Sequence, residues 1–292
     1  MRLPEGAATR VRFRPMPSGK KSKQIRRAAQ SAPPPVQSKG SGRKRQASPR
    51  VLMLGAGGVA IVVVIVVLAI VLSGGGSSSN SGIPKTLPKF GSLANGLPGA
   101  SDVQTMFKGI PQKGFFLGSA FAPVQMVIYI DLQCPICQNF ETTAAPTLIS
   151  KYVRTGKLRI EVKPWAFIGP DSFRGQAAMM AAAKQNKAFN YAQVLYDNQG
   201  TENTGWLNDS MVYQIAESVP GLNVPQLLSD RKASTVKKQV SDVAADATAN
   251  HVSGTPTVFV GKSGTKPKLV GGQSTAPDLA QVTLAIDSAL LG

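Results

Sequence analysis

The chain has 292 residues, enough for one or two domains, and a formal net charge of +18. Residues 1–50 contain fourteen Lys or Arg and a single acid, which gives +13, whereas residues 73–292 contain nineteen basic and fourteen acidic side chains, which gives +5. Because the charge belongs mainly to a tail, it excludes a strongly basic globular surface, and no nucleic-acid partner is expected for the globular part.

Residues 1–50 are predicted to be a disordered basic tail in the cytoplasm. They are rich in Pro, Ser, Gly, Lys and Arg and nearly free of aromatic side chains, so they cannot bury enough apolar area to fold. Such a tail can bind anionic lipid or nucleic acid, or its charge can simply fix the membrane topology. The positive-inside bias favours the second interpretation.

Residues 51–72 are predicted to form a single transmembrane helix. These 22 residues carry no charge, and as a helix they would extend roughly 33 Å, enough to cross a hydrocarbon core. A cleavable signal peptide is the alternative, but its apolar region is usually about 7–15 residues long and follows a shorter basic region. We therefore expect an uncleaved signal-anchor in the cell membrane, with everything after Ser73 on the extracytoplasmic side.

A flexible linker is predicted over residues 73–100, where Gly, Ser and Pro dominate. One domain is expected after it, over residues 101–292. Outside the cytoplasm disulfides form and persist, and this domain contains only two cysteines, so no third thiol competes with the pair.

The domain begins with a predicted β-α-β pattern, after a short helix near residue 101. The apolar run 124–131 has the β-branched and aromatic composition of a strand buried on both faces. Helical spacing follows over residues 138–153, with a kink or break expected at Pro146, and residues 157–167 have the composition of a second strand.

The rest of the domain is predicted to be a helical block followed by a β-β-α pattern. Met and aromatic side chains at helical spacing within about 171–250 are expected to be core. A hairpin is expected over 255–260 and 266–272, and then an amphipathic helix with Thr275 as its cap. This order is that of a thioredoxin fold with an inserted helical domain, an α/β fold preceded here by a transmembrane helix.

The two cysteines stand in the motif C-P-I-C, at the point where the first strand gives way to a helix. At the start of that helix, unpaired backbone N–H groups and the helix dipole would stabilise the Cys134 thiolate and make it the attacking sulfur. Pro135 suits the first helical turn, where no N–H is needed, and Ile136 completes the turn. Cys137 lies one turn further on, so it can close a disulfide with Cys134 or resolve a mixed disulfide.

A metal site and an inert disulfide are the alternatives for this pair. A structural zinc site needs four ligands, and the chain offers two cysteines and one histidine, His251, so no metal is expected. A disulfide between residues three apart closes a very short loop and stabilises little. We therefore expect a redox-active disulfide, Cys134–Cys137, with no further cofactor.

The second element is G-T-P-T, with Pro256 just before a predicted strand. Alone, this motif is typical of an ordinary turn. Together with the cysteine pair it suggests that a cis Thr255–Pro256 bond holds the backbone of Thr255 against the disulfide, where it could pair with a substrate strand.

The stretches "LGSAFAPVQMVIYIDLQCPICQNFE" and "HVSGTPTVFVGK" resemble the DsbA-like branch of the thioredoxin superfamily. The specific parts are A-P-V before the strand, D-x-Q-C-P-x-C at its end and G-T-P-T before the later strand, and the resemblance extends over about residues 117–291. It implies that Cys134 is the nucleophile, Cys137 the resolving cysteine and Thr255–Pro256 the cis-proline pair. It also implies exported, thiol-containing protein substrates and a quinone-linked membrane partner of the DsbB or vitamin K epoxide reductase type.

Two positions depart from the family pattern. Ile136 stands where the best-studied oxidases have His, and an imidazolium there would stabilise the thiolate and make the disulfide more oxidising. Ile128 stands where many relatives carry a buried acid. Asp131 and Glu141 are nearby but are expected to be solvated, because carboxylates are rarely buried unpaired, and His251 is expected at the surface or at a helix end.

The sequence therefore predicts a membrane-anchored, extracytoplasmic thiol–disulfide oxidoreductase, more an oxidase than a reductase, since the compartment favours the disulfide form. A reductase or isomerase of the same fold is one alternative. A thioredoxin-fold module that binds a partner without turnover is the other.

Overall fold

The computed structural model describes residues 82–272 and 276–292. The predicted tail, the predicted transmembrane helix over 51–72, nearly all of the glycine-rich start of the linker and the predicted cap Thr275 lie outside these residues. Within the described part of the chain, no helix is both long enough and apolar enough to cross a membrane.

The centre of the domain is a six-stranded mixed sheet in the order β1-β2-β4-β3-β5-β6. Its strands are β1 (Gln112–Lys113), β2 (Phe116–Leu117), β3 (Val124–Ile130), β4 (Leu158–Pro164), β5 (Thr257–Lys262) and β6 (Lys268–Val270). The central pair β3–β4 is parallel, with Met126 opposite Ile160. The other neighbours are antiparallel, including the predicted β5–β6 hairpin.

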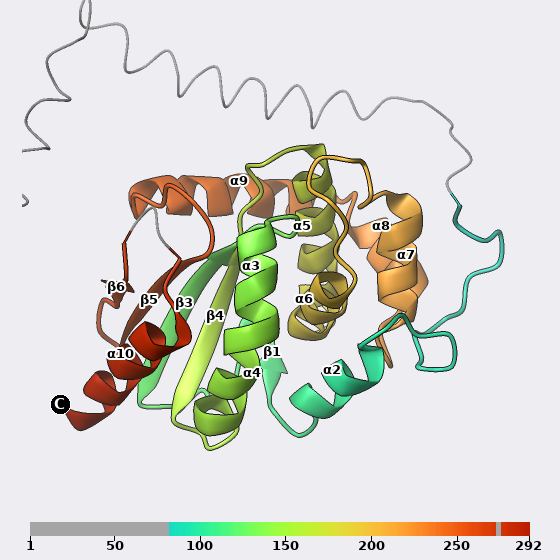
Figure 1. Ribbon diagram of the computed structural model, residues 1–292. Helices are drawn as coiled ribbons and strands as arrows, with labels where there is room; N and C mark the ends of the chain where they lie inside the picture. Colours follow the sequence, from blue (N-terminus) through green and yellow to red (C-terminus); the bar gives the residue numbers. More distant parts are fainter. Residues whose placement is uncertain (1–81, 273–275) are drawn as a thin grey trace, which may run out of the picture. The chain divides into compact units, whose positions relative to one another are not determined.

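The helical segments complete a thioredoxin fold, as the sequence predicts. They are α2 (Ala100–Phe107), α3 (Pro135–Asn139), η1 (Phe140–Ala144), α4 (Ala145–Leu148), η2 (Ile149–Val153), α5 (Pro170–Ala183), α6 (Ala188–Asp197), α7 (Asp209–Glu217), α8 (Val224–Asp230), α9 (Ser234–Ala249) and α10 (Leu279–Leu291). The segment from α3 to η2 connects the parallel pair β3 and β4, and α5 to α9 lie between β4 and β5 in the chain (Figure 1).

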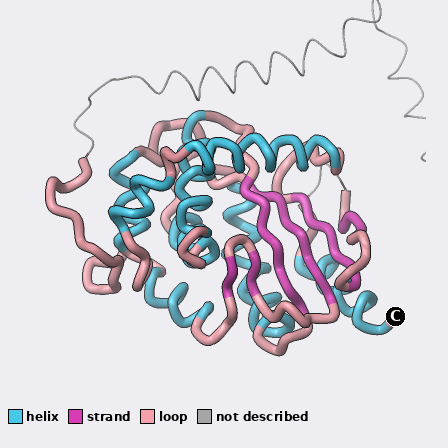
Figure 2. The backbone as a smooth tube through the Cα atoms, turned by 180° about the vertical axis from the view of Figure 1, so that it is seen from behind, coloured by secondary structure: helices cyan, strands magenta, loops and turns pink. Residues whose placement is uncertain are grey.

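Strand β3 is buried on both faces because its side chains alternate between two apolar clusters. Met126, Ile128 and Ile130 belong to the main core, whereas Val127 and Tyr129 pack in a smaller cluster with residues of α9 and the loop after it. Figure 1 shows α3 and α10 in front of the sheet, and Figure 2, seen from behind, shows α9 crossing one end of the strands. The predicted Met and aromatic core of the helical block is also present, since Met179, Tyr191 and Tyr196 are fully buried.

The helix after the cysteines continues through Pro146, so of the predicted kink or break the break does not occur. Residues 135–153 stay helical throughout, but with two π-helical segments, η1 and η2. The N–H of Ala145 donates to the carbonyl of Phe140, five residues back, and this wide turn brings Pro146 into the first turn of α4. A proline there needs no N–H partner, so the helix continues through it.

Two further boundaries differ from the predictions. Strand β4 ends at Pro164 rather than at residue 167, and the N–H groups of Trp165 and Phe167 donate to Ile130 and Asp131 at the end of β3. The last helix is capped by Asp278, whose side chain accepts from the N–H of Gln281 in a capping box, so Thr275 is not its cap.

Candidate active site

Cys134 is the N-cap of α3, at the junction of strand and helix that the sequence predicts. Its N–H donates to the carbonyl of Asp131 at 3.0 Å, its carbonyl accepts from Gln138, and Pro135 occupies the first helical turn. Both cysteines are thiols here. Cys134 keeps 5% of its surface exposed and Cys137 none, so of the two buried cysteines only Cys134 reaches the surface.

The loop before β5 brings Thr255 and Pro256 against Cys134. The Thr255–Pro256 peptide bond is cis, and the Cys134 Sγ–H donates to the Thr255 carbonyl at 3.5 Å. Thr255 also favours the thiolate form of Cys134, and it does so at Cys137 against the stronger opposing effect of burial. The structure thus brings together Cys134 and Thr255, two of the predicted site residues, which lie 121 positions apart in the chain.

The two thiols have opposite acidities. A hydrogen bond from the Cys137 thiol, helped by the backbone N–H groups of Cys137 and Ile136 and by Thr255, lowers the pKa of Cys134 to about 6 against the opposing effect of burial. Burial, followed by the neighbouring Cys134, raises the pKa of Cys137 well above its ordinary value. At neutral pH the arrangement therefore favours a thiolate on the accessible sulfur and a thiol on the buried one.

Asp131 is buried, and the prediction that it is solvated is wrong. Its Oδ1 accepts from the N–H of Gln133 at 3.0 Å, and its Oδ2 accepts from Phe167 and Ile168 at 3.0 and 3.2 Å. Three backbone donors stabilise a carboxylate without any cation. Asp131 therefore ties the turn before Cys134 to the loop that follows β4.

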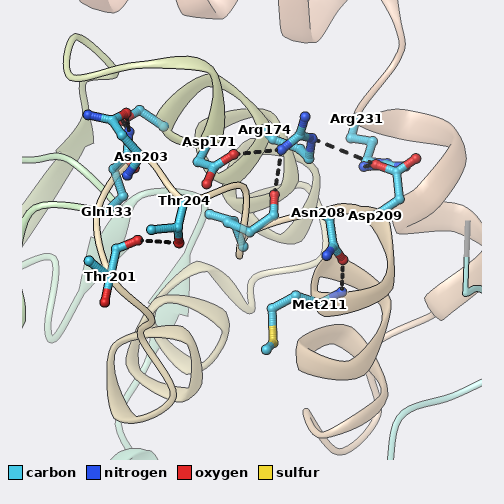
Figure 3. A network of polar contacts seen from close by, with 12 residues as sticks. Gln133, Asp171, Arg174, Thr201, Asn203, Thr204, Asn208, Asp209, Met211 and Arg231 are labelled. Carbon is cyan, nitrogen blue, oxygen red and sulfur yellow. Dashed lines mark hydrogen bonds and ion pairs between the residues drawn. The ribbon is translucent and has the colours of Figure 1, made fainter. Parts of the chain in front are cut away.

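Gln133 is a residue of the site that sequence reasoning missed. Its side chain is fully buried. Figure 3 shows it beside Asn203: its Oε1 accepts from the N–H of Asn203, and its Nε2 donates to Asn203 Oδ1. The same Nε2 also donates to Ser172 Oγ. Its carbonyl accepts from Gln199 Nε2 at 2.7 Å. The only available signal is its place directly before Cys134, at the end of an apolar strand.

Glu141 lies four residues after Cys137 and is half-buried, so it is less solvated than we expected. Burial raises the pKa of its carboxyl to about 7, and within the described residues no side chain or backbone group forms a hydrogen bond with it. It lines a core cavity of about 20 Å³. The other lining residues include Ile128 of β3, Phe140 of η1, and Phe189 and Gln193 of α6. Ile128 is apolar core, so the nearby carboxyl comes from the helix and not from β3.

Two large apolar side chains near the turn that carries Cys134 are exposed. Ile136, between the cysteines, is 54% exposed, and Phe167 is 44% exposed and stacks on Trp165 with 4.6 Å between ring centroids. His251 is exposed just after the C-terminal end of α9, with φ 55°, as expected for a surface or helix-end residue. Among residues 82–272 and 276–292, no three His, Cys, Asp or Glu side chains cluster so that they could hold a metal ion.

Comparison with known proteins places this site in a family context. The family model described as "Thioredoxin" matches residues 111–271. The "Probable disulfide bond formation protein D" of Bacillus cereus is 30% identical over 177 residues, which is 60% of this chain and 77% of that protein. Oxidised BdbD from Bacillus subtilis superposes with a TM-score of 0.55 at 20% identity, over 63% of this chain and 98% of BdbD. For α-DsbA1 of Wolbachia pipientis the TM-score is 0.52 at 20% identity, over 62% and 91%. Both structures share the fold.

Proposed function

Because this chain belongs to the DsbA-like thiol:disulfide oxidoreductases of the thioredoxin superfamily, we propose that Cys134 and Cys137 are its redox couple and that it works as an oxidase. In this role it introduces disulfides into exported proteins. The observation that carries the proposal is the contrast between the two cysteines: Cys134 keeps 5% of its surface exposed and has a pKa of about 6, whereas Cys137 is fully buried and has a raised pKa.

The reaction begins from the Cys134–Cys137 disulfide. A substrate thiolate attacks Cys134 Sγ, the Cys134–Cys137 bond breaks, and the electron pair leaves on Cys137, which takes up a proton because its pKa is raised. A second substrate thiolate then attacks the substrate sulfur of the mixed disulfide and releases Cys134 as a thiolate. The substrate is oxidised by two electrons, and the couple is reduced to the dithiol.

The low pKa of Cys134, the sulfur released in the second step, makes the couple a stronger oxidant in two ways. The leaving sulfur is Cys134, and a thiol of low pKa leaves faster than an ordinary one. The stabilised Cys134 thiolate also lowers the free energy of the reduced form, which raises the reduction potential of the couple. Both effects support electron flow from substrate to enzyme.

Thr255 and Pro256 are proposed to bind the substrate. The loop that carries them lies against Cys134, and an extended substrate segment there could pair with the Thr255 backbone by β-addition. The exposed Ile136 and Phe167 nearby suit the apolar side chains of an unfolded chain.

The proposed setting is the extracytoplasmic side of the cell membrane, with the apolar run 51–72 as a single-pass anchor and the basic residues 1–50 in the cytoplasm. Each turnover leaves two electrons on the couple, so a membrane partner must accept them. By family resemblance, this partner is a quinone-linked oxidase of the DsbB or vitamin K epoxide reductase type.

The first test is the reduction potential of the couple, measured on the full chain in detergent by equilibration with glutathione buffers. A value near about −120 mV is expected of an oxidase. A value near about −270 mV would mark a thioredoxin-like reductant and overturn the oxidase role.

The second test separates turnover from mere binding. The Cys137→Ala variant cannot resolve a mixed disulfide, so it is expected to accumulate covalent, reducible adducts with exported proteins through Cys134. The Cys134→Ser, Cys137→Ala variant is the matched control and should trap none. A cellular phenotype that survives the loss of both cysteines would instead favour a binding module.

A further inference from the structure

Gln133 occupies a junction of three segments that are distant in the chain. Its amide contacts Ser172 at the start of α5, 39 residues away, and Asn203 in the loop between α6 and α7, 70 residues away. The amide is fully hydrogen-bonded: both N–H groups have an acceptor, at 2.8 and 3.1 Å, and the oxygen has a donor at 2.9 Å. A buried amide that is satisfied in this way has a single favourable position.

The loop itself is held at both ends. Gln199 at its start donates to the carbonyl of Gln133, and Leu207 at its end accepts from Arg174 of α5 at 2.7 Å. Arg174 is in turn paired with Asp171 (Figure 3). The loop is therefore a rigid part of the helical block, although residues 201–205 are exposed.

The packing at this junction leaves no free space. A Cβ atom on Gly169 would lie 2.2 Å from Asn203 Oδ1 and 3.4 Å from Gln133 Nε2, so the absence of a side chain at 169 is what lets the Asn203 amide reach Gln133. Asn203 has a left-handed backbone conformation, with φ 59°, which turns its N–H and its side chain toward the same amide.

We propose that Gln133 is a positioning residue for Cys134, and that Asn203 and Ser172 are the partners through which the helical block fixes the place of the nucleophile. This inference rests on the proposed role of Cys134. Gln133 precedes Cys134 directly, and the hydrogen bonds that stabilise the Cys134 thiolate depend on where that residue enters α3. A turn released from the helical block would move Cys134 relative to the N–H groups of Ile136 and Cys137.

The Asn203→Gly variant tests the proposal most directly. Glycine accepts the left-handed conformation and keeps the N–H that donates to Gln133 Oε1, so only the side-chain contact is lost and the fold is retained. The matched control is Asn186→Gly: Asn186 has the same φ of 59° and is exposed, and its side chain accepts from Gly114 instead. Ser172→Ala removes the other acceptor of Gln133 Nε2 and keeps the helix.

The measurement is the pH profile of alkylation of Cys134 by iodoacetamide in the reduced full chain, with peptide mapping to assign the modified cysteine. Loss of one hydrogen bond is expected to lower the thiolate fraction at pH 5 about three- to tenfold and to move the midpoint of the profile upward. Asp131, Cys137, Glu141 and Tyr196, the titratable groups around the pair, are unchanged in these variants. The control should keep the wild-type profile.

The outcomes separate this proposal from the proposed function. Upward shifts in Asn203→Gly and Ser172→Ala, and none in Asn186→Gly, would support the positioning role. Unchanged profiles in both variants, or an equal shift in the control, would overturn it and leave the oxidase proposal standing; if one variant does not fold, the other decides. An ordinary thiol profile for wild-type Cys134 would instead contradict the proposed function.

Discussion

The segment before the cysteine pair and the segment after it are built in opposite ways. Before the pair, Asp131 and Gln133 are buried polar residues, and every oxygen of their side chains accepts a hydrogen bond. After the pair, Phe140 and Leu148 line an apolar cavity, and the one carboxylate there, Glu141, has no hydrogen-bond partner within the described residues.

This contrast divides two tasks between the two sides. Directional hydrogen bonds fix where the turn that carries Cys134 lies, whereas an apolar surrounding decides which protonation state is stable. Burial is the main cause of the raised pKa of both Cys137 and Glu141. Position is thus set before Cys134, and the raised proton affinity of Cys137 and Glu141 is set after it.

The largest effect is expected from Asp131→Ala. The substitution leaves the N–H groups of Gln133, Phe167 and Ile168 without their acceptor in a buried place. Each buried unpaired group costs about 1–3 kcal/mol, so we expect a loss of about 3 kcal/mol or more in the free energy of unfolding, measured by urea denaturation of the reduced protein.

The control is Asp242→Ala, which removes an exposed ion pair with Lys238 one turn away on α9. Such pairs contribute about 0.3–0.5 kcal/mol. Equal losses in the two variants would contradict the view that backbone donors hold the turn before Cys134.

The next effect is a pH dependence caused by Glu141. Its pKa rises from 4.5 to about 7 on folding, so between these values the folded state binds more protons than the unfolded state, and stability falls as pH rises. The full shift corresponds to about 3 kcal/mol, and partial exposure of the residue reduces this toward about 2 kcal/mol. Glu141→Gln, which stays neutral, should match wild type at pH 4.5 and be more stable by this amount at pH 8.

Urea denaturation of the reduced proteins at both pH values gives this difference between variant and wild type. The comparison with wild type cancels the opposite pH dependence of Cys134, whose lowered pKa adds stability as pH rises from about 6 to 9. Glu202→Gln, at an exposed position, is the matched control. A Glu141→Gln variant with the same stability difference at both pH values would show that the carboxyl is solvated after all.

The two sides also differ in how far the sequence predicted them. Local patterns placed Cys134 at the junction of strand and helix, and the motif around Pro256 predicted the nearby loop. Asp131 was assigned wrongly because its donors, Phe167 and Ile168, are 36 and 37 residues away and depend on where β4 ends.

The surroundings of Gln133 and Glu141 could not be predicted from the sequence for the same reason. The partners of Gln133 come from the helical block, 39 and 70 residues away. The desolvation of Glu141 comes from the packing of η1 against α6, where Phe189 lines the same cavity. Periodicity predicts which face of an element is buried, but it does not identify the element that covers that face.

A smaller effect is expected from Gly169→Ala, which disturbs the hydrogen bonds of Gln133 through its partner Asn203. The new Cβ would lie 2.2 Å from Asn203 Oδ1, so the Asn203 side chain must leave Gln133, at an expected cost of about 1–2 kcal/mol in stability. Gly254→Ala is the control, because a Cβ there meets nothing within 4 Å. Adding Asn203→Gly should relieve the clash, so urea denaturation of the double variant should show less than the sum of the two losses.

The smallest effect is expected from Ile136→His, at the position between the two cysteines. Ile136 is 54% exposed, so the imidazole can stay in solvent beside Cys134. Its protonated form stabilises the thiolate and lowers the pKa of Cys134. A three- to tenfold gain in the reduced form raises the reduction potential by about 15–30 mV, and the gain should shrink from pH 6 to pH 8 as the imidazole loses its proton. The neutral Ile136→Gln variant is the control. If it shifts the potential equally, or if the gain persists at pH 8, then charge at this position does not set the acidity of Cys134, and the hydrogen bonds from Cys137 and the helix start set it alone.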